Sequence, residues 1–153
     1  MRRKLLLFSC VLTALSLNVV KAQEYQSMPI ASGLNADVIA NGEGTVVSST
    51  SIDIDGVNYN YVATDFKLTP TSSPIAYGVP ANGLINSIVT ATPGLSYQLA
   101  PLTGNNSLRL TGTNTGTITF TTPLAAVNLY MLAVTGSGSG TVSAVVNFSD
   151  GTT

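Results

Sequence analysis

The feature that most constrains the fold is a repeated alternation of short strand-like segments and turn residues. Between Gln23 and Thr153 there is no amphipathic helix pattern of useful length, and short runs rich in Thr, Val, Ile and Tyr are separated by Gly, Asn, Pro and Ser. This pattern predicts an all-β fold. The candidate strands cover residues 45–54, 57–63, 85–90, 95–99, 107–110, 115–121, 129–134 and 141–148. Their spacing predicts a two-sheet antiparallel sandwich or jelly roll.

The second half of the chain shows this alternation most clearly. Every second residue of segment 141–148 is apolar, which predicts one face turned toward the core, whereas segment 129–134 is apolar on both faces and reads as a central strand covered on both sides. Between them lies GSGSG, residues 136–140. Because two strand-like segments flank it directly, it is interpreted as a flexible hairpin loop rather than an interdomain linker.

The N-terminus carries a different pattern. Two arginines and a lysine follow the initiator methionine, an apolar run covers residues 5–20, and small residues at Val20 and Ala22 precede Gln23. This order predicts a secretory signal peptide over residues 1–22, cleaved between Ala22 and Gln23, and hence a secreted or cell-surface protein. The run is shorter and more polar than a membrane anchor, so no membrane span is expected in the mature chain.

Removal of the leader changes the charge balance. Of six Lys and Arg only Lys67 and Arg109 remain, whereas all seven acidic residues stay, so the formal net charge becomes −5. A chain so poor in basic residues cannot neutralise nucleic-acid phosphates or bind an anionic lipid surface. Nucleic acid is therefore excluded as an expected partner.

The two side chains most often used for metal binding and neutral-pH catalysis are missing from the mature chain. The single cysteine, Cys10, lies in the leader, and the sequence has no histidine. The mature chain is therefore expected to have no disulfide, no Cys or His metal ligand and no imidazole base. Its serines lack an activating base, so an enzyme is not expected. Residues 23–153 are enough for one domain with a core of its own.

The sharpest turn signal is SIDIDGVNYNY, residues 51–61. Asp-Gly is a preferred pair for a two-residue type I′ turn. A turn at Asp55-Gly56 places Ile54 opposite Val57 and sends one set of side chains toward the core. That set is Ile52, Ile54, Val57, Tyr59 and Tyr61.

The outer face of this predicted hairpin holds Asp53 and Asn58, with Asp55 nearby. Their oxygens are ligands of the kind that calcium takes, and the alternative interpretation is a solvated cross-strand pair. Tyr59 and Tyr61 are also candidates for a sugar-stacking platform, but the predicted pairing turns them inward, so a core role is favoured.

Two loops rich in Asn and Gly supply further candidates. Asn82 lies in one, Asn105 and Asn106 lie in the other, and Arg109 follows closely. Their side chains offer hydrogen bonds to a glycan or protein ligand. The alternative is that Asn and Gly are present to adopt left-handed backbone geometry in turns.

The chain ends shortly after a second Asp-Gly pair, Asp150-Gly151. A turn without a returning strand leaves an unpaired sheet edge, which proteins normally avoid. We therefore expect the last strand or strands of the sandwich to lie beyond Thr153.

Three long stretches together resemble a known group of proteins. They are DIDGVNY (53–59), GLINSIVTATPGLSYQLAPLTGNNSLRL (83–110) and GTITFTTPLAAVNLYMLAVTGSGSGTVSAVVNFSDGTT (116–153). With the segment after residue 22, they resemble the N-terminal β-sandwich of large secreted Bacteroidota proteins, which often carry a C-terminal sorting domain for type IX secretion. The resemblance implies a build similar to galactose-binding-like jelly rolls, and it implies no catalytic residues.

Two functions are therefore expected from the sequence. The first is a secreted or surface-displayed β-sandwich module without catalysis, which binds a glycan or a protein. The second is the accessory domain of an exported hydrolase whose catalytic part lies beyond Thr153.

Overall fold

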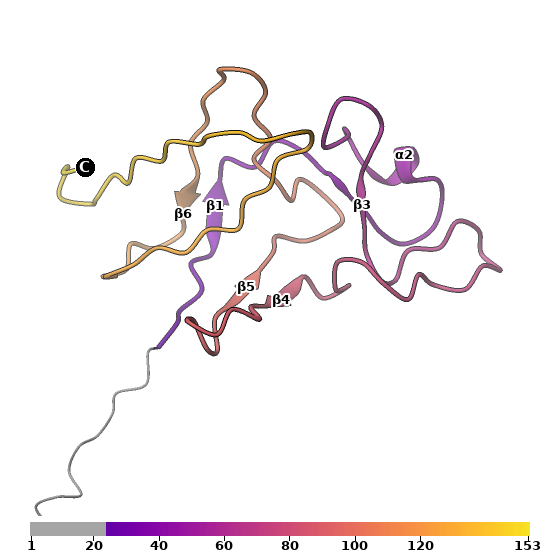
Figure 1. The fold of residues 1–153 in the computed structure, drawn as a ribbon, viewed down its shortest axis with the longest axis horizontal. Coiled ribbons are helices and arrows are strands. Elements are labelled where there is room, and N and C mark those ends of the chain that lie inside the picture. The colour runs from indigo at the N-terminus through magenta and orange to yellow at the C-terminus, as the bar shows by residue number, and fades with distance from the viewer. Residues whose placement is uncertain (1–23) are drawn as a thin grey trace, which may run out of the picture.

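The computed structural model describes residues 24–153, so the predicted leader and its cleavage junction at Ala22–Gln23 lie outside the described residues. The described chain is an all-β fold with one short helix (Figure 1). Its strands are β1 (Ile30–Ser32), β2 (Ile39–Ala40), β3 (Tyr61–Val62), β4 (Leu84–Asn86), β5 (Ser96–Gln98) and β6 (Thr119–Phe120), and its helix is α2 (Val46–Ser49). The helix is too short and too polar to cross a bilayer, and no other described helix could do so.

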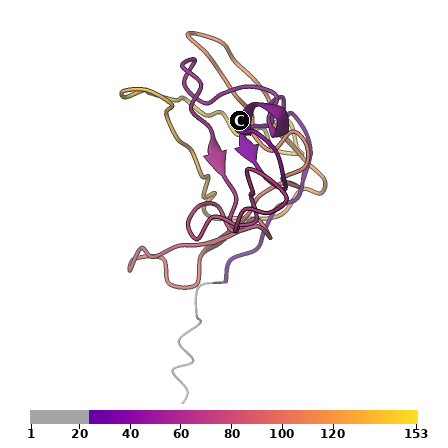
Figure 2. The ribbon, with the colours of Figure 1, turned by 90° about the vertical axis from the view of Figure 1, so that its right-hand side faces the viewer.

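The strands pair two by two. β1 pairs with β6 and β4 with β5, both antiparallel, whereas β2 and β3 pair in parallel. Figure 2 shows β2 and β3 side by side and pointing the same way. The parallel pair departs from the expected antiparallel pairing, because residues 41–60 form a crossover that returns the chain to the end at which β2 began.

The core lies between the β2–β3 pair and the segment before Arg109. Its buried cluster consists of Ala36, Val38, Ile39, Ala63 and Leu102, with Ile54, Val79 and Leu99 packed against it. Burial of these apolar side chains stabilises the fold by roughly 25 cal/mol per Å² removed from water. Residues far apart in the sequence are thereby held together around the stretch from residue 36 to residue 40.

Some expected strands are replaced or absent. Residues 45–54 contain α2 instead of a strand, because the Thr45 hydroxyl accepts the N–H of Ser48 and caps a single helical turn. The expected strands at 57–63, 85–90, 95–99 and 115–121 are confirmed only in their shorter forms β3, β4, β5 and β6. Segment 107–110 contributes a single bridge, from Ser107 to Ala36.

Residues 129–134 and 141–148 form no strand in the described chain. The prediction that 129–134 is covered on both sides is wrong, since Leu132 is 54% exposed. The prediction of an inward face on 141–148 is also wrong, since Val142 is 69% and Phe148 56% exposed. Neither segment is part of a described sheet, and most of their apolar side chains reach solvent.

These two segments are the arms of a long loop that is fixed at two points. The ring of Tyr25 meets the ring of Tyr130 edge to face, 5.7 Å apart, which attaches the first arm to the N-terminal segment. Burial, followed by the nearby Tyr130 and Tyr97, raises the pKa of Tyr25. At the tip, a Cβ on Gly136 would overlap the carbonyl oxygen of Ile54, so glycine permits a close approach there.

Candidate functional site

The segment between Asp53 and Tyr59, here called the Asp53 loop, is organised by two carboxylates. Oδ1 of Asp53 accepts the N–H of Gly56 and Oδ2 accepts that of Asn58, both at 2.9 Å. Oδ1 of Asp55 accepts the N–H groups of Val57 and Tyr59, at 2.9 and 3.2 Å. The two carboxylates therefore accept hydrogen bonds from backbone N–H groups in place of backbone carbonyls, as Asp side chains in turns commonly do.

This arrangement overturns the predicted two-residue turn. The N–H of Ile54 donates to the carbonyl of Tyr59 at 2.8 Å, so Tyr59 and not Val57 lies opposite Ile54. A type I′ turn needs positive φ at both central residues, but among the non-glycine described residues only Asn58 has positive φ, at 70°. The carboxylates stabilise a wider loop of four residues, which the Asp-Gly pair alone does not reveal.

The wider loop also reverses the predicted direction of the side chains. Tyr59 is 71% and Tyr61 37% exposed, and Val57 and Ile52 also face solvent. Only Ile54 of the predicted inward set packs against the core cluster. The inward assignment of Tyr59 and Tyr61 is therefore wrong, and both rings are available at the surface.

Arg109 reaches the Asp53 loop from the other side of the core. Its Nη2 lies 3.2 Å from Oδ1 of Asp53, and its Nε donates to the Asp53 carbonyl at 2.7 Å. The N–H of Asn58, with smaller contributions from the N–H of Gly56 and from Arg109, lowers the pKa of Asp53 against an opposing effect of burial. Of the predicted site residues, the structure thus brings together Asp53, Asp55, Asn58 and Arg109.

This geometry leaves little room for calcium at Asp53, Asp55 and Asn58. Both oxygens of Asp53 already accept backbone hydrogen bonds, and the Arg109 guanidinium also lies 3.2 Å from its Oδ1. A cation would have to displace Arg109, because like charges this close repel strongly. Within residues 24–153, no three Asp or Glu side chains gather in a metal-binding group. Calcium at this loop stays a prediction.

Asn106 and Asn105, although adjacent, lie in different environments. Asn106 is 8% exposed, its Oδ1 accepts the N–H of Val38 at 3.1 Å, and its Nδ2 donates to Oδ1 of Asp37 at 2.6 Å. Asn105 is exposed, and its amide reaches only the carbonyl of Leu34, at 3.4 Å. The structure therefore places Asn106 in the core as a polar link between segments, where a ligand does not reach it.

Asn82 lies away from these residues, in the turn before β4. Its Oδ1 accepts the N–H of Leu84 at 3.1 Å, and its carbonyl accepts the amide of Gln98 at 3.0 Å. The predicted ligand-binding residues Asn82, Asn105, Asn106 and Arg109 therefore do not converge on one site.

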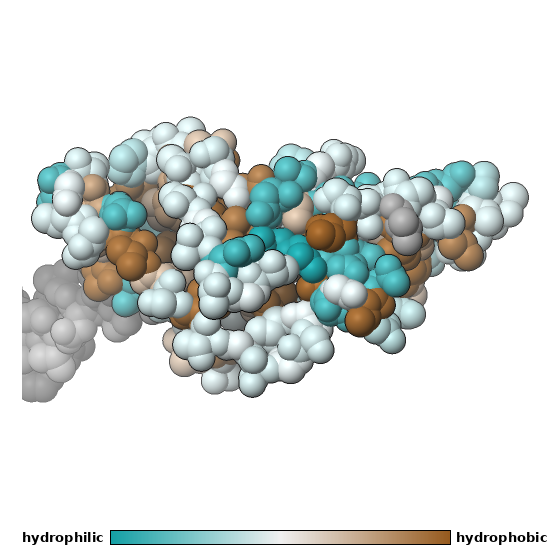
Figure 3. Space-filling model, turned by 90° about the horizontal axis from the view of Figure 1, so that it is seen from above, coloured by the Kyte–Doolittle hydropathy of each residue, from teal (hydrophilic) through white to brown (hydrophobic). Residues whose placement is uncertain are grey.

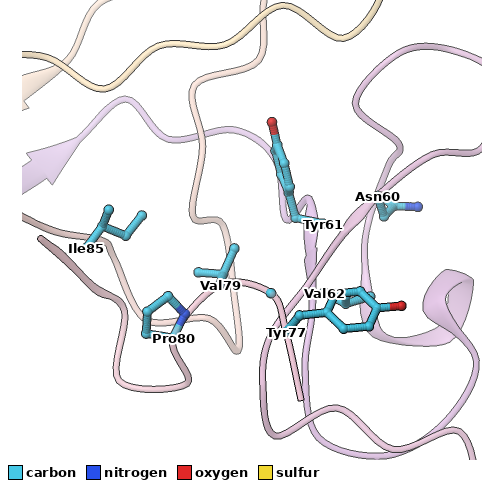
Figure 4. A pocket seen from close by; sticks show the side chains of 8 residues that line it. Asn60, Tyr61, Val62, Tyr77, Val79, Pro80 and Ile85 are labelled. Atoms are coloured by element: carbon cyan, nitrogen blue, oxygen red, sulfur yellow. The ribbon is translucent and has the colours of Figure 1, made fainter. Parts of the chain in front are cut away.

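A surface cavity of about 440 Å³ offers a different site. It is lined by Asn60, Tyr61, Val62, Tyr77, Gly78, Val79, Pro80 and Ile85 (Figure 4). The close-up shows Tyr61 pointing upward and Tyr77 extending to the right below it, with Val79, Pro80 and Ile85 to their left. Tyr77 is 76% exposed. The cavity, here called the Tyr61–Tyr77 pocket, is mostly apolar and carries polar groups at only a few points, as small-molecule sites commonly do.

Backbone hydrogen bonds with β3 position the segment that carries the ring of Tyr77. The N–H of Val79 donates to the carbonyl of Val62 at 2.8 Å, and the N–H of Thr64 donates to the carbonyl of Val79 at 2.9 Å. Gly78 has φ of 135°, and a Cβ there would overlap the Val62 carbonyl oxygen. Only glycine allows the segment carrying Tyr77 to lie this close to β3.

One polar atom in the pocket wall has no partner. The Oδ1 of Asn60 is shielded from solvent and accepts no hydrogen bond. An unsatisfied buried acceptor costs about 1–3 kcal/mol, which a donor on a bound molecule would recover. Sequence reasoning considered Tyr61 as a sugar platform but missed Tyr77 and Asn60. The signal for Tyr77 was an aromatic residue in a loop directly before Gly78-Val79-Pro80.

Comparison of the chain with known protein families, with curated proteins and with solved structures finds no match.

Proposed function

We propose that this protein is a secreted or cell-surface β-sandwich module, formed by residues 23–153, that binds a neutral glycan without acting on it. The observation that carries the proposal is the pair of exposed tyrosine rings, Tyr61 and Tyr77, beside an apolar cavity of about 440 Å³. Tyrosine combines an apolar ring face with a polar hydroxyl and loses little conformational entropy on binding. A sugar ring presents the complementary surface, with C–H groups on its faces and hydroxyls around its edge.

The polar groups of the pocket favour a sugar over a proline-rich peptide, which also binds aromatic grooves. Proline has no N–H and would leave the Oδ1 of Asn60 without a donor. A sugar hydroxyl supplies that donor once the Asn60 amide turns toward the ligand. The lining residues carry no charge, which favours a neutral glycan over an acidic one.

The remaining chemistry supports binding rather than catalysis. Asp53 is paired with Arg109 and holds two backbone N–H groups, and its pKa is lowered. An acid held in its ionised form is a poor proton donor, and the sequence offers no imidazole to take that role. The apolar segment over residues 5–20 supports export.

Glycan arrays with the exported protein, followed by calorimetric titration of the best oligosaccharide, test this function. Tyr77→Ala and Tyr61→Ala are expected to weaken binding by about tenfold each, or 1.4 kcal/mol. Tyr59→Ala is the matched control, because Tyr59 is 71% exposed, close to the 76% of Tyr77, but does not line the pocket. Absence of binding to every neutral glycan, or equal losses in all three variants, refutes the proposal.

A further inference from the structure

An apolar surface alone does not single out a ligand for this molecule, because exposed apolar side chains are common on it. Ile88 is 96% and Val127 98% exposed, and neither lines the cavity. Figure 3, seen from above, shows hydrophobic side chains reaching the surface at several separate places. The Tyr61–Tyr77 pocket differs by one polar atom in its wall, the shielded Oδ1 of Asn60, which accepts no hydrogen bond. A ligand that fits this pocket therefore brings a donor into apolar surroundings.

The rest of the pocket wall is apolar or already paired. Aliphatic groups come from Val62, Val79, Pro80 and Ile85 (Figure 4). The carbonyl of Val62 accepts the N–H of Val79, and the carbonyl of Val79 accepts the N–H of Thr64. Among the lining residues, the Oδ1 of Asn60 is therefore the one buried side-chain oxygen or nitrogen that a ligand has to satisfy.

Two kinds of donor on a neutral sugar can reach such an oxygen, a hydroxyl and an amide N–H. A hydroxyl also carries two acceptor lone pairs, which are left without donors when they face an aliphatic wall. An amide N–H has no acceptor capacity, so it satisfies the oxygen without burying a second polar group that needs a partner. The shielded position of the Asn60 oxygen therefore favours an amide N–H.

The group beside the amide N–H also fits this wall. In a planar trans amide, the N–H and the acetyl methyl lie on one edge, and the carbonyl oxygen lies on the opposite edge. One edge of an acetamido group therefore offers a donor and a methyl together, which matches an acceptor beside aliphatic side chains. The carbonyl faces away from the wall, where solvent or the hydroxyl of Tyr61 or Tyr77 can donate to it.

We propose that the Tyr61–Tyr77 pocket binds a 2-acetamido sugar, an N-acetylhexosamine, whose N–H donates to Oδ1 of Asn60 and whose methyl contacts the aliphatic wall. This inference rests on the proposed glycan-binding function and narrows its ligand class. To face the ligand, the Asn60 amide turns about its terminal torsion, which is broad and roughly two-fold in asparagine. No hydrogen bond within the described chain opposes this rotation.

Calorimetric titration of the purified protein with two matched pairs of methyl glycosides tests the ligand class. The pairs are N-acetylglucosamine with glucose and N-acetylgalactosamine with galactose, and the members of each pair differ only at the second carbon. The acetamido member of at least one pair is expected to bind about tenfold more tightly than its counterpart. Equal binding within both pairs overturns this inference and leaves the glycan-binding function standing. Absence of binding to every neutral glycan refutes both.

Asn60→Ala tests whether the shielded oxygen recognises the acetamido group. The variant is expected to weaken binding of the acetamido sugar about tenfold and that of its counterpart much less, so that the preference disappears. Asn60→Asp keeps an acceptor oxygen and should retain the preference. Asn105→Ala, an exposed asparagine outside the pocket, is the matched control and should leave the preference unchanged. Because the preference is a ratio between two ligands on one protein, partial unfolding does not alter it, and its persistence in Asn60→Ala overturns the assignment.

N-acetyl-lysine amide distinguishes a sugar from an acetylated peptide, because it carries the acetamido group without a sugar ring. It is expected to bind at least about tenfold more weakly than the preferred sugar, since it offers no ring face to Tyr61 and Tyr77. Binding as tight as that of the sugar would show that the pocket recognises the acetamide alone and would overturn the proposal.

Discussion

The region around residues 35–67 and the arms over residues 121–153 have similar β-forming sequences, yet they differ in how they are held. In the first region, side chains of Asn35, Asp37 and Asp53 bond to backbone or side-chain groups far along the chain. In the arms, every residue is exposed, and beyond Thr121, whose hydroxyl donates to the Pro29 carbonyl at 3.1 Å, the side-chain hydrogen bonds of the described residues are local. The comparison teaches that apolar alternation alone does not fix these segments. Where polar side chains link distant segments the chain packs, and where they are missing the apolar residues stay at the surface.

The largest expected difference between the two regions is the stability lost when an apolar side chain is shortened to alanine. Ile39→Ala removes a side chain that is 5% exposed within the core cluster and should destabilise the fold by about 2–5 kcal/mol. Val142→Ala should change stability by less than about 0.5 kcal/mol, since its side chain faces solvent. Urea denaturation measures both changes in the free energy of unfolding. Equal effects would show that the arms are as well packed as the core.

The next largest expected effect is a difference in stability between alanine variants of two neighbouring asparagines. Asn106→Ala leaves the N–H of Val38 without its acceptor and removes the shorter of two hydrogen bonds to Oδ1 of Asp37, and should cost about 1–3 kcal/mol of stability. Asn105→Ala, beside it in the sequence, removes only a long contact to Leu34 and should be close to neutral. The difference in thermal midpoint between the two variants is the measurement. A neutral Asn106→Ala would mean that the link between segments contributes nothing.

The smallest expected effect is the acid response of the Asp53 loop. Since folding lowers the pKa of Asp53, the unfolded chain takes up a proton more readily, and stability from this group is complete above the ordinary Asp range and lost as pH falls through the lowered pKa. The melting temperature of the unmodified chain should therefore fall more steeply than that of Asp53→Asn between neutral pH and about pH 2.

Asp65→Asn is the control for this acid response, because Asp65 is exposed and forms none of the loop contacts. The pKa of Asp150 is also lowered, by the N–H and hydroxyl of Thr152, but this contribution is common to all three proteins. Parallel pH curves for the unmodified chain and Asp53→Asn would contradict the assigned role of the carboxylate.

The sequence predicted the all-β class because strand-forming residues and turn residues alternate throughout residues 23–153. The predicted inward positions of Tyr59 and Tyr61 were wrong because local hydrogen bonds determine the conformation of the loop that precedes them. The decisive bonds, from Asp53 to the N–H groups of Gly56 and Asn58, form between groups that an Asp-Gly rule does not consider. The pocket was missed for a second reason, since Tyr77 comes beside β3 only through the tertiary pairing of Val79 with Val62.

One small detail bears on how the protein ages. The side chain of Asn35 accepts the N–H of Arg109 at 2.7 Å and donates to its carbonyl at 3.0 Å, so one primary amide imitates the peptide group of a neighbouring strand. Loss of ammonia from Asn35 would turn this mimic into a carboxylate, which cannot donate and which faces a carbonyl oxygen. Slow hydrolysis at a single exposed amide would thus remove one of the two hydrogen bonds that hold the Arg109 backbone, beside the guanidinium that pairs with Asp53.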